Sequence, residues 1–515
     1  AAVADKHIKR LNDSLNQSCK IEFVDLSSKV GVEIYTFALI ILLARVVSEL
    51  FPEAEMQIKY SLGKGIYGEI EMERQLNQND VGIIENRMRQ IVEADEPFES
   101  SELPKSLVMN LFRSNQYSRK RDLLSYWLQE TVKIVTCGGY SDFYMHPLIS
   151  STGVLKVFAL RYYMPGFLLL RPLQENPQVL PEYQEPYKYA KILQQTDKWA
   201  DIIKVRSVVD LNHVIEAPDQ ENNIRRLIDM EEGKQEKDII KIAEQITDHI
   251  DSSRLVLIAG PSASGKTTFI KRLANQLRIN GLNPVSISAD DYFLSRELTP
   301  RNENGEYDFE CLEAINLELF NQHLSSLIQG EEIELPYYDF KSGLSLLSGK
   351  VLQLKPNDLL IIEGIHCLND RLTLSIPNSR KFKIYIGAWT HLVLDNLHRV
   401  HAADIRLLRR MVRDARTRDK SPQETLRQWP LVRRGEENNI FPFQNNADVV
   451  FNSALAYEIA VLKKYAEPLL KQISSKERKH WQAQMLLQLL SFVLPMDSNY
   501  ICSNSLLREF IGEAR

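Results

Sequence analysis

The sequence predicts an α/β protein in two parts. The carboxy-terminal half is expected to hold a parallel sheet flanked by helices, and the amino-terminal half to be an α+β region. After residue 254, apolar strands alternate with amphipathic helices, which is typical of a parallel sheet covered on both faces. Before about residue 215, short strands of alternating polarity mix with helical stretches. The change of pattern predicts two joined architectures.

The composition is that of a multidomain globular protein. Its 515 residues, 44% of them hydrophobic, suffice for several domains of about 150 residues each. The net charge of -5 comes from 63 basic and 68 acidic residues mixed along the chain, so charge alone predicts no nucleic-acid partner. The five cysteines are scattered without a metal or redox spacing, which indicates a reducing compartment, and we expect the cytoplasm.

The most apolar run of the chain extends from Ile34 to Val47. It is interrupted by Thr36 and Arg45 and is shorter than the roughly 20 residues that cross a bilayer. We therefore expect a buried helix and no membrane association. Short strands are predicted downstream at Gln57–Tyr60 and Tyr67–Met72.

A charged, Asn-rich stretch from Ala217 to Gln235 is expected to be a connector, followed by an amphipathic helix over Ile239–Ile250. Beyond it, the pattern predicts the following strands and helices in order: strand Leu255–Ala259, a helix ending at Arg278, strands Pro284–Ser288, Leu359–Ile362 and Lys383–Ile386, and helices over Ile459–Ile473 and Trp481–Val493.

Between the first of these strands and its helix lies a loop that matches G-x-x-x-x-G-K-[ST], the P-loop pattern. Its glycines let backbone N–H groups face a phosphate chain, which the positive end of the helix also attracts. Lys266 is expected to neutralise the β- and γ-phosphates, Thr267 to give a hydroxyl to Mg²⁺, and Thr268 to reach the α-phosphate. A chance match on a Gly/Ser turn is the alternative. The predicted ATP-binding residues are Gly260, Ser262, Ala263, Ser264, Gly265, Lys266, Thr267 and Thr268.

A P-loop alone does not separate a kinase from a GTPase or a motor. The chain has no N-K-x-D tetrapeptide to read guanine, and acidic and aromatic residues follow the loop where a motor has sensor arginines. The surrounding sequence therefore favours a kinase.

Acidic residues end two of the predicted strands. Asp290 and Asp291 follow Ser288 at the carboxyl edge of a parallel sheet, where ligands bind. A carboxylate there can accept the proton of an attacking hydroxyl, and we expect Asp291 to do so. Glu363 ends the strand Leu359–Ile362 and is expected to hold Mg²⁺ directly or through water. Capping of the next turn and an ordinary strand-end acid are the respective alternatives.

A cluster of arginines lies downstream, and its spacing puts several of them on one helix face. Such a face could close over ATP as a lid and stabilise charge on the transferred group. A solvated basic helix and an RNA contact are the alternatives. The cluster comprises Arg406, Arg409, Arg410, Arg413, Arg416, Arg418 and Lys420.

These features together resemble the uridine kinase and phosphoribulokinase family over about residues 252–470. The ordered blocks are the P-loop, Asp290-Asp291-Tyr-Phe, Glu306-Tyr-Asp308-Phe, Pro336-Tyr-Tyr338-Asp-Phe340, Glu363-Gly-Ile and Arg409-Arg410-Met-Val-Arg413-Asp414. The resemblance implies ATP and Mg²⁺ as cofactors, Asp291 as catalytic base, Asp308 against the ribose hydroxyls, and Tyr338 and Phe340 beside the base. It puts Arg410, Arg413, Arg418 and Lys420 on the substrate-facing helix and lid.

Two positions depart from the family pattern. Gly343 stands where uridine kinases carry a histidine that reads the pyrimidine, and Lys420 replaces an arginine of the lid. Specificity of this kind rests on paired polar groups. The resemblance implies phosphorylation of a nucleoside such as uridine or cytidine at its 5'-hydroxyl. A kinase for another small alcohol or sugar phosphate and an ATP-regulated RNA-binding protein are the alternatives.

The front half resembles threonyl-tRNA synthetases. Ile21–Ser28 is similar to the tail of their TGS domain, and Val32–Arg171 to their second additional domain. That domain edits with an H-x-x-x-H pair plus a later cysteine and histidine, and this sequence has no H-x-x-x-H. With His146 alone in the region and Cys137 not at ligand spacing, we expect neither zinc nor editing hydrolysis.

The resemblances divide the chain into a TGS-like tail, a region like the second additional domain, a connector with one helix, a P-loop kinase domain and a helical extension. The expected ranges are 1–27, 28–215, 216–251, 252–470 and 471–515. The expected partner is a small-molecule substrate, while RNA binding through the front half and a homo-oligomer stay open. His366 is expected either to line the site or to pack in the core, and His398 with His401 to be surface or packed residues and not metal ligands.

Overall fold

The computed structural model describes residues 1–4, 7–15, 18–113, 118–145, 148–250, 253–301, 305–339 and 341–513. The chain forms two compact units that interleave along the sequence. The first unit comprises residues 1–223, 390–404 and 459–497, and the second comprises residues 224–389, 405–458 and 498–513 of the described chain. The domain ranges expected from the sequence are contiguous, so they do not coincide with these units.

Helix α1 (Lys29–Leu50) is the core helix of the first unit. Ser28 caps it by accepting a hydrogen bond from the Gly31 amide, and sixteen of its residues are buried. Among the described residues it is the one helix long and apolar enough to span a membrane, and 83% of its most apolar window is buried within the fold. A helix that is apolar on all sides needs such a surround. The expected buried helix is confirmed.

The largest sheet of the first unit is antiparallel, with the order β4-β5-β10-β9. Its strands are Glu55–Leu62 (β4), Gly65–Glu71 (β5), Ala159–Tyr163 (β9) and Gly166–Leu170 (β10). Helices α1 and α2 (Gln78–Ala94) share its apolar core. Both strands predicted in this half are therefore present, as β4 and β5.

Two smaller sheets and several helices complete the first unit. The sheets are β2-β1-β3 (His7–Lys9, Ala2–Ala4, Ile21–Phe23) and β6-β7-β8 (Glu99–Pro104, Thr131–Cys137, Tyr140–Phe143). The helices are α3 (Lys105–Leu111), α4 (Ser118–Ser125), α5 (Tyr187–Ile203), α6 (Val208–Glu216), α12 (Glu458–Lys471) and α13 (His480–Ser491).

Helix α7 spans Gln220–Asp248 without a break, so the connector expected over Ala217–Gln235 is wrong for most of its length. Its first turns bury Ile224, Leu227 and Ile228 on one face. This apolar stripe at helical spacing is diluted in the sequence by many charged residues, which is why the stretch looked like a linker.

The second unit is built on a sheet of parallel strands in the order β12-β15-β11-β16-β17. Its strands are Leu255–Ala259 (β11), Asn283–Ser288 (β12), Asp358–Glu363 (β15), Lys381–Gly387 (β16) and Val449–Asn452 (β17). This confirms the predicted parallel sheet. The strand β12 is adjacent to β15, and β15 separates it from β11.

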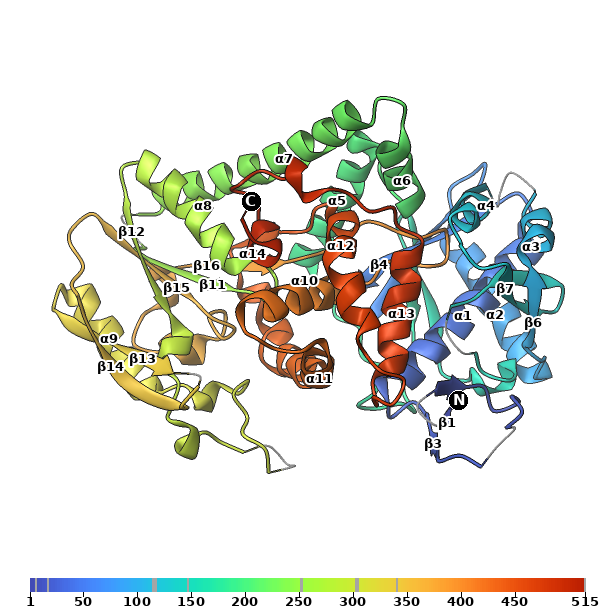
Figure 1. Ribbon diagram of the computed structural model, residues 1–515, viewed down its shortest axis with the longest axis horizontal. Coiled ribbons are helices and arrows are strands. Elements are labelled where there is room, and N and C mark those ends of the chain that lie inside the picture. The colour runs from blue at the N-terminus through green and yellow to red at the C-terminus, as the bar shows by residue number, and fades with distance from the viewer. Residues whose placement is uncertain are drawn as a thin grey trace. The chain divides into compact units, whose positions relative to one another are not determined.

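Both faces of this sheet are covered, as the apolar strands predicted. One face, with Val256, Ile258 and Ile361, packs on α7 and on α8 (Lys266–Ile279). The other face, with Leu257 and Ile362, packs on α9 (Leu317–Gln329) and on the hairpin of β13 and β14 (Ile333–Asp339, Leu344–Leu352). Figure 1 shows α7 and α8 on one side of the sheet and α9 on the other.

Three more helices contribute to the second unit. They are α10 (Ala402–Thr417), α11 (Pro422–Asn439) and the short α14 (Arg508–Ile511). Leu506, just before α14, is fully buried in the cluster that joins α7 and α8 to the sheet. The end of the described chain is thus part of the core of this unit.

The contact of α8 with the sheet can be tested at Phe269. This side chain is fully buried and its ring lies 4.6 Å from that of Phe451 on β17. We expect Phe269→Ala to destabilise the second unit by about 3–5 kcal/mol, because it removes buried area and leaves a cavity. Ile279→Ala on the same helix, at a position 75% exposed, should change stability by less than about 0.5 kcal/mol. Urea denaturation of both variants measures the difference, and equal midpoints would contradict it.

Candidate functional site

The loop between β11 and α8 has the backbone geometry of an anion-binding turn. Gly265 precedes the helix with φ +88°, and Ala263 also has a positive φ, at +59°. A Cβ atom on Gly260 would stand 2.4 Å from the carbonyl oxygen of Ile386, so only glycine fits there. The eight residues predicted to bind ATP therefore form one tight loop and the first turn of α8.

Within this loop, Lys266 folds back over the backbone. Its Nζ donates to the carbonyl oxygens of Gly260 at 2.8 Å and Pro261 at 3.4 Å. Thr267, the next residue, is exposed. The ammonium group thus lies against the loop backbone, and Thr267 is open to solvent.

Two carboxylates accept hydrogen bonds from amides of this loop and helix. Glu436 of α11 accepts from the Ser262 amide at 3.2 Å, and Glu509 of α14 accepts from the Thr268 amide at 3.1 Å. Backbone N–H groups of the loop and of the first turn of α8 thus hold anionic oxygens. This is the observation by which the loop fits a phosphate chain.

Two arginines of α10 donate hydrogen bonds to backbone carbonyls of the loop. Arg406 donates to the Ser262 carbonyl at 3.0 Å and forms a buried ion pair with Glu436 at 2.8 Å. Arg409 is fully buried, donates to the Ala263 carbonyl at 3.3 Å and pairs with Glu458. The alternative of a solvated basic helix is wrong for these residues, because buried carboxylates and carbonyls neutralise them.

Three further members of the arginine cluster gather around Asp414, whose side chain is fully buried. Arg410 donates to Ser262 Oγ at 2.7 Å and lies 3.3 Å from Asp414, and Arg413 pairs with Asp414 at 2.8 Å. Arg418 lies 3.7 Å from the same carboxylate. Lys420 donates to Gln428 Oε1 at 3.1 Å. The structure brings Arg410, Arg413 and Arg418 together at one acid next to the loop.

The acids that end β12 and β15 are neighbours. Ser288 and Glu363 pair in register, and Ser288 Oγ donates to Glu363 Oε1 at 3.3 Å. Asp290 and Asp291 follow β12 in a short turn, where Ser288 caps the Asp290 amide. The three predicted acids thus lie at one edge of the sheet.

Burial raises the pKa of Asp290 to about 6, and the nearby charge of Glu363 adds to this rise, while Lys266 opposes it. Burial and Glu363 also raise the pKa of Asp291 above its ordinary value. The positive charges of Lys266 and Arg418 partly offset this rise in the pKa of Asp290, and that of Lys350 does so for the pKa of Asp291.

The predicted acceptor residues lie in a different environment from the one expected. Tyr338 is only 1% exposed and packs edge-to-face on Phe293 with ring centroids 5.5 Å apart. Asp308 accepts from the Glu310 amide at 3.0 Å. Burial raises the pKa of Glu310 to about 7 despite the nearby Arg410. Phe340 lies outside the described residues.

Gly343, where a histidine was expected from the family pattern, adopts φ +75° in the turn between β13 and β14. A Cβ atom there would meet the guanidinium of Arg296 at 2.6 Å. The Arg296 amide also donates to the Gly343 carbonyl at 2.7 Å. A cationic side chain therefore fills the space in which a side chain at position 343 would begin.

Two of the histidines singled out in the sequence, His366 and His398, are buried, whereas His401 is exposed. Burial lowers the pKa of His366, next to Glu363-Gly364, to about 4, so its ring is neutral. His398 pairs with Asp395 at 2.9 Å in the first unit. Cys137 accepts from Arg45 at 3.2 Å, and His146 lies outside the described residues. Across the part of the chain that the structure describes, no three His, Cys, Asp or Glu side chains are grouped as metal ligands would be.

Glu310, Asp414, Glu436 and Glu509 were missed by sequence reasoning about this site. Asp414 directly follows Arg413 in a recognised block, so a signal existed for it. Glu436 and Glu509 are single acids in helices far along the chain and belong to no motif. Nothing in their local sequence indicates that they contact the loop.

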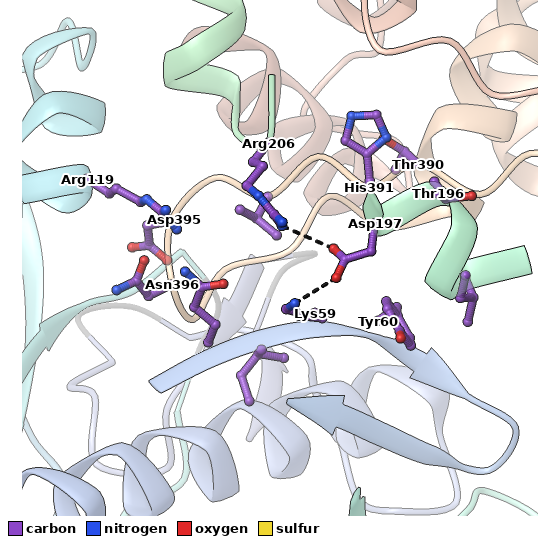
Figure 2. A pocket seen from close by; sticks show the side chains of 14 residues that line it. Lys59, Tyr60, Arg119, Thr196, Asp197, Arg206, Thr390, His391, Asp395 and Asn396 are labelled. Atoms are coloured by element: carbon purple, nitrogen blue, oxygen red, sulfur yellow. Dashed lines mark hydrogen bonds and ion pairs between the residues drawn. The ribbon is translucent and has the colours of Figure 1, made fainter. Parts of the chain in front are cut away.

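The first unit contains a small hollow lined by Lys59, Arg119, Asp197, Arg206 and neighbouring residues of β4, α5 and segment 390–396. Figure 2 shows Lys59 and Arg206 reaching Asp197, at 2.7 and 3.2 Å. Its volume of about 30 Å³ holds one or two waters, whereas small-molecule pockets have about 300–1,000 Å³. Its central charges also neutralise one another. The loop of the second unit therefore remains the better candidate site.

The second unit is similar in sequence to proteins of one family. Residues 255–460 match the model of the Phosphoribulokinase / Uridine kinase family. A uridine kinase of Halalkalibacterium halodurans is 29% identical over 208 residues, which cover 40% of this chain and 89% of that protein. A solved structure described as a possible uridine kinase from Bacillus stearothermophilus shares 19% identity with a TM-score of 0.28, covering 42% of this chain and 98% of that one.

The amino-terminal part is similar to threonine–tRNA ligases. The ligase of Francisella tularensis subsp. novicida is 26% identical over 220 residues, which cover 41% of this chain. The chain spans about a third of the length of that ligase, 34%. The expected resemblances of both halves are confirmed at the level of the family model and of these relatives.

Because the pKa of Asp290 is raised in the fold, removing the charge of this side chain should stabilise the folded protein at neutral pH and above. Its pKa is about 6 in the fold against an ordinary 3.8, so stability is lost as pH rises through this interval and the carboxylate ionises. Asp290→Asn cannot ionise and should melt at a higher temperature than the original protein at pH 8, with the difference fading toward pH 4. The exposed Glu332→Gln serves as control. A melting difference that is independent of pH would contradict the account.

Proposed function

We propose that the second unit is an ATP-dependent kinase that transfers the γ-phosphate to a hydroxyl of a small substrate, with a nucleoside such as uridine or cytidine, at its 5'-hydroxyl, as the leading acceptor. The observation that carries this proposal is the pair of carboxylates on the loop amides, next to acids at the ends of β12 and β15. Amides that hold anions beside a candidate base are what phosphoryl transfer requires. The family match of residues 255–460 supports it.

In this proposal the loop amides and Lys266 bind the phosphate chain of ATP. Lys266 leaves the Gly260 and Pro261 carbonyls and donates to phosphate oxygens. Thr267 and Glu363 would hold Mg²⁺, since a hydroxyl and a strand-end carboxylate are oxygen ligands suited to this hard cation. When bound, Mg²⁺ supplies positive charge that neutralises the phosphates.

A carboxylate at the end of β12 orients the acceptor hydroxyl and takes its proton. The acceptor oxygen attacks the γ-phosphorus, the bond between that phosphorus and the β,γ-bridging oxygen breaks, and ADP leaves. The sequence favoured Asp291 for this role. The nearby charge of Lys266 and the pKa of about 6 favour Asp290, because a base works best with a pKa near the working pH.

In this proposal, the arginines around Asp414 stabilise the negative charge that develops on the transferred phosphoryl group. Arg410 donates to Ser262 Oγ at 2.7 Å, so it lies at the loop, and Arg413 shares the Asp414 carboxylate with it at 2.8 Å. Arg418 and Lys420 follow directly after α10. Fixed cations of this kind stabilise the transferred group in the transition state.

For the acceptor we keep Asp308 as the residue that binds the ribose hydroxyls, with Tyr338 and Phe340 on the side of the base. Tyr338 is packed on Phe293, so its contribution would be to shape the wall of the site and not to stack freely.

A second candidate is a kinase for a small alcohol that carries a negative charge, such as a sugar phosphate. Gly343 and Arg296 favour it, because a guanidinium lies 2.6 Å from the ideal Cβ position at residue 343. An arginine recognises phosphate or carboxylate, whereas a neutral base needs paired polar groups.

Loss of the loop lysine should slow the transfer of phosphate. We expect Lys266→Ala to lower kcat/KM for ATP by about 10²–10³-fold, because it removes a cation from the transferring group. Lys271→Ala, an exposed lysine on the same helix, is the matched control and should leave kcat/KM unchanged. A coupled assay for ADP release measures both, and similar rates for the two variants would exclude this site.

Replacing the two candidate bases separately should distinguish them. Asp290→Asn is expected to lower kcat by about 10²–10⁴-fold while ATP binding persists, and Asp291→Asn to have a smaller effect. Rate assays at saturating substrate give kcat for both variants, and calorimetry gives their affinity for ATP. The reverse order of effects would return the role of base to Asp291.

The acceptor is identified by measuring ADP release in the presence of nucleosides, sugar phosphates and neutral small alcohols in turn. Stimulation by uridine or cytidine supports the leading acceptor. Stimulation by sugar phosphates alone supports the second candidate. A tRNA gel shift at low salt with and without ATP tests the alternative of an RNA-binding protein, since phosphate contacts are strongest there.

A further inference from the structure

We infer that the carboxy-terminal segment 498–513, beyond the residues that match the family, is part of the nucleotide site, and that Glu509 competes with the α-phosphate for the amide of Thr268. The Glu509 carboxylate accepts from this amide at 3.1 Å. The inference rests on the proposed function, because it assigns the amide end of α8 to the phosphates of a nucleotide.

The segment that carries Glu509 is held firmly by the second unit. Leu506 is fully buried in the same apolar cluster as Phe269, the residue that follows Thr268. Arg508 donates to the carbonyl oxygen of Ser498 at 3.0 Å and also to that of Ile501. The contact of Glu509 with the helix is therefore made by a packed segment.

The same segment contacts the helix that supports the loop. Arg416 of α10 donates to the carbonyl oxygens of Glu509 at 3.0 Å and Phe510 at 3.2 Å. The Arg409 guanidinium lies 5.0 Å from the centre of the Phe510 ring. A Cβ atom on Gly265 would reach Leu506 at 3.2 Å. The segment thus contacts both α10 and the turn that begins α8.

The amide of Thr268 can donate to one anion at a time, and this creates the competition. Thr268 is the third residue of α8, where a backbone amide has no acceptor within the helix. This end of the helix also carries the partial positive charge of the helix dipole. A phosphate that takes this amide must displace the carboxylate, and two negative groups so close repel each other.

Glu436 differs from Glu509 in what holds it. Arg406 and Arg433 both form ion pairs with Glu436, at 2.8 and 2.6 Å. Although burial opposes it, the charge of Arg406 keeps the pKa of Glu436 below its ordinary value. For the Glu509 carboxylate, by contrast, the hydrogen bond seen among the described residues is the one from the Thr268 amide. Glu436 is thus a fixed part of the loop, and Glu509 is the displaceable anion.

The test is calorimetric titration of the full chain with ADP, inorganic pyrophosphate and adenosine, in Glu509→Gln and in Glu513→Gln. Glu513 is an exposed glutamate of the same segment and is the matched control. We expect Glu509→Gln to bind ADP about three- to tenfold more tightly, since one negative charge near the phosphates is removed. Adenosine, which has no phosphate, should bind both variants and the original protein equally.

Glu509→Asp gives a second measurement, because it shortens the side chain and draws the charge away from the amide. Its affinity for ADP should lie between those of the original protein and Glu509→Gln. Unchanged or weaker ADP binding in Glu509→Gln, with normal adenosine binding, overturns the inference and leaves the proposed function intact. Absence of binding of all three ligands to the original protein overturns both.

Discussion

Buried guanidinium–carboxylate pairs behind the phosphate-binding loop are the interaction on which the second unit depends. Arg406 pairs with Glu436 and Arg409 with Glu458, and both arginines also donate to loop carbonyls. A buried charge without its partner costs free energy of folding, so the arginine and the carboxylate of each pair hold one another in place. Helix α10, helix α11 and the loop are therefore held as one body. The positions of the loop amides, including that of Ser262, follow from this arrangement.

The same site contains groups that weaken the fold. Asp290 and Glu310 are acids whose pKa values burial raises to about 6 and about 7, and Lys266 donates to its own loop carbonyls. A protein selected for stability alone would not gather these acids near one another. The proposed kinase chemistry requires a base such as Asp290, a metal-binding acid such as Glu363 and cations within reach of one phosphate. The local cost of these groups is thus explained by the proposed chemistry.

Much of this fold could be predicted because buried parallel strands are continuous apolar runs, as in Leu255–Ala259 and Leu359–Ile362, and because the P-loop pattern is local. The start of α7 was missed since charged residues dilute its apolar stripe. The burial of Arg409 depends on Glu458, 49 positions away, and no local pattern encodes such a pair. The contacts of Glu436 and Glu509 with the loop are equally remote in sequence. The interleaving of the units is also non-local, as with the Ile58 amide that donates to the Asn396 carbonyl at 2.8 Å.

The most direct test of the central claim is to follow the γ-phosphorus itself. The full chain is incubated with ATP labelled at this atom and with an acceptor that stimulates ADP release, and the products are separated. The account predicts that the label appears in the phosphorylated acceptor in a one-to-one ratio with ADP. Label recovered in inorganic phosphate, or bound covalently to the protein, would contradict direct transfer to a hydroxyl and would indicate an ATPase or a phosphoenzyme instead.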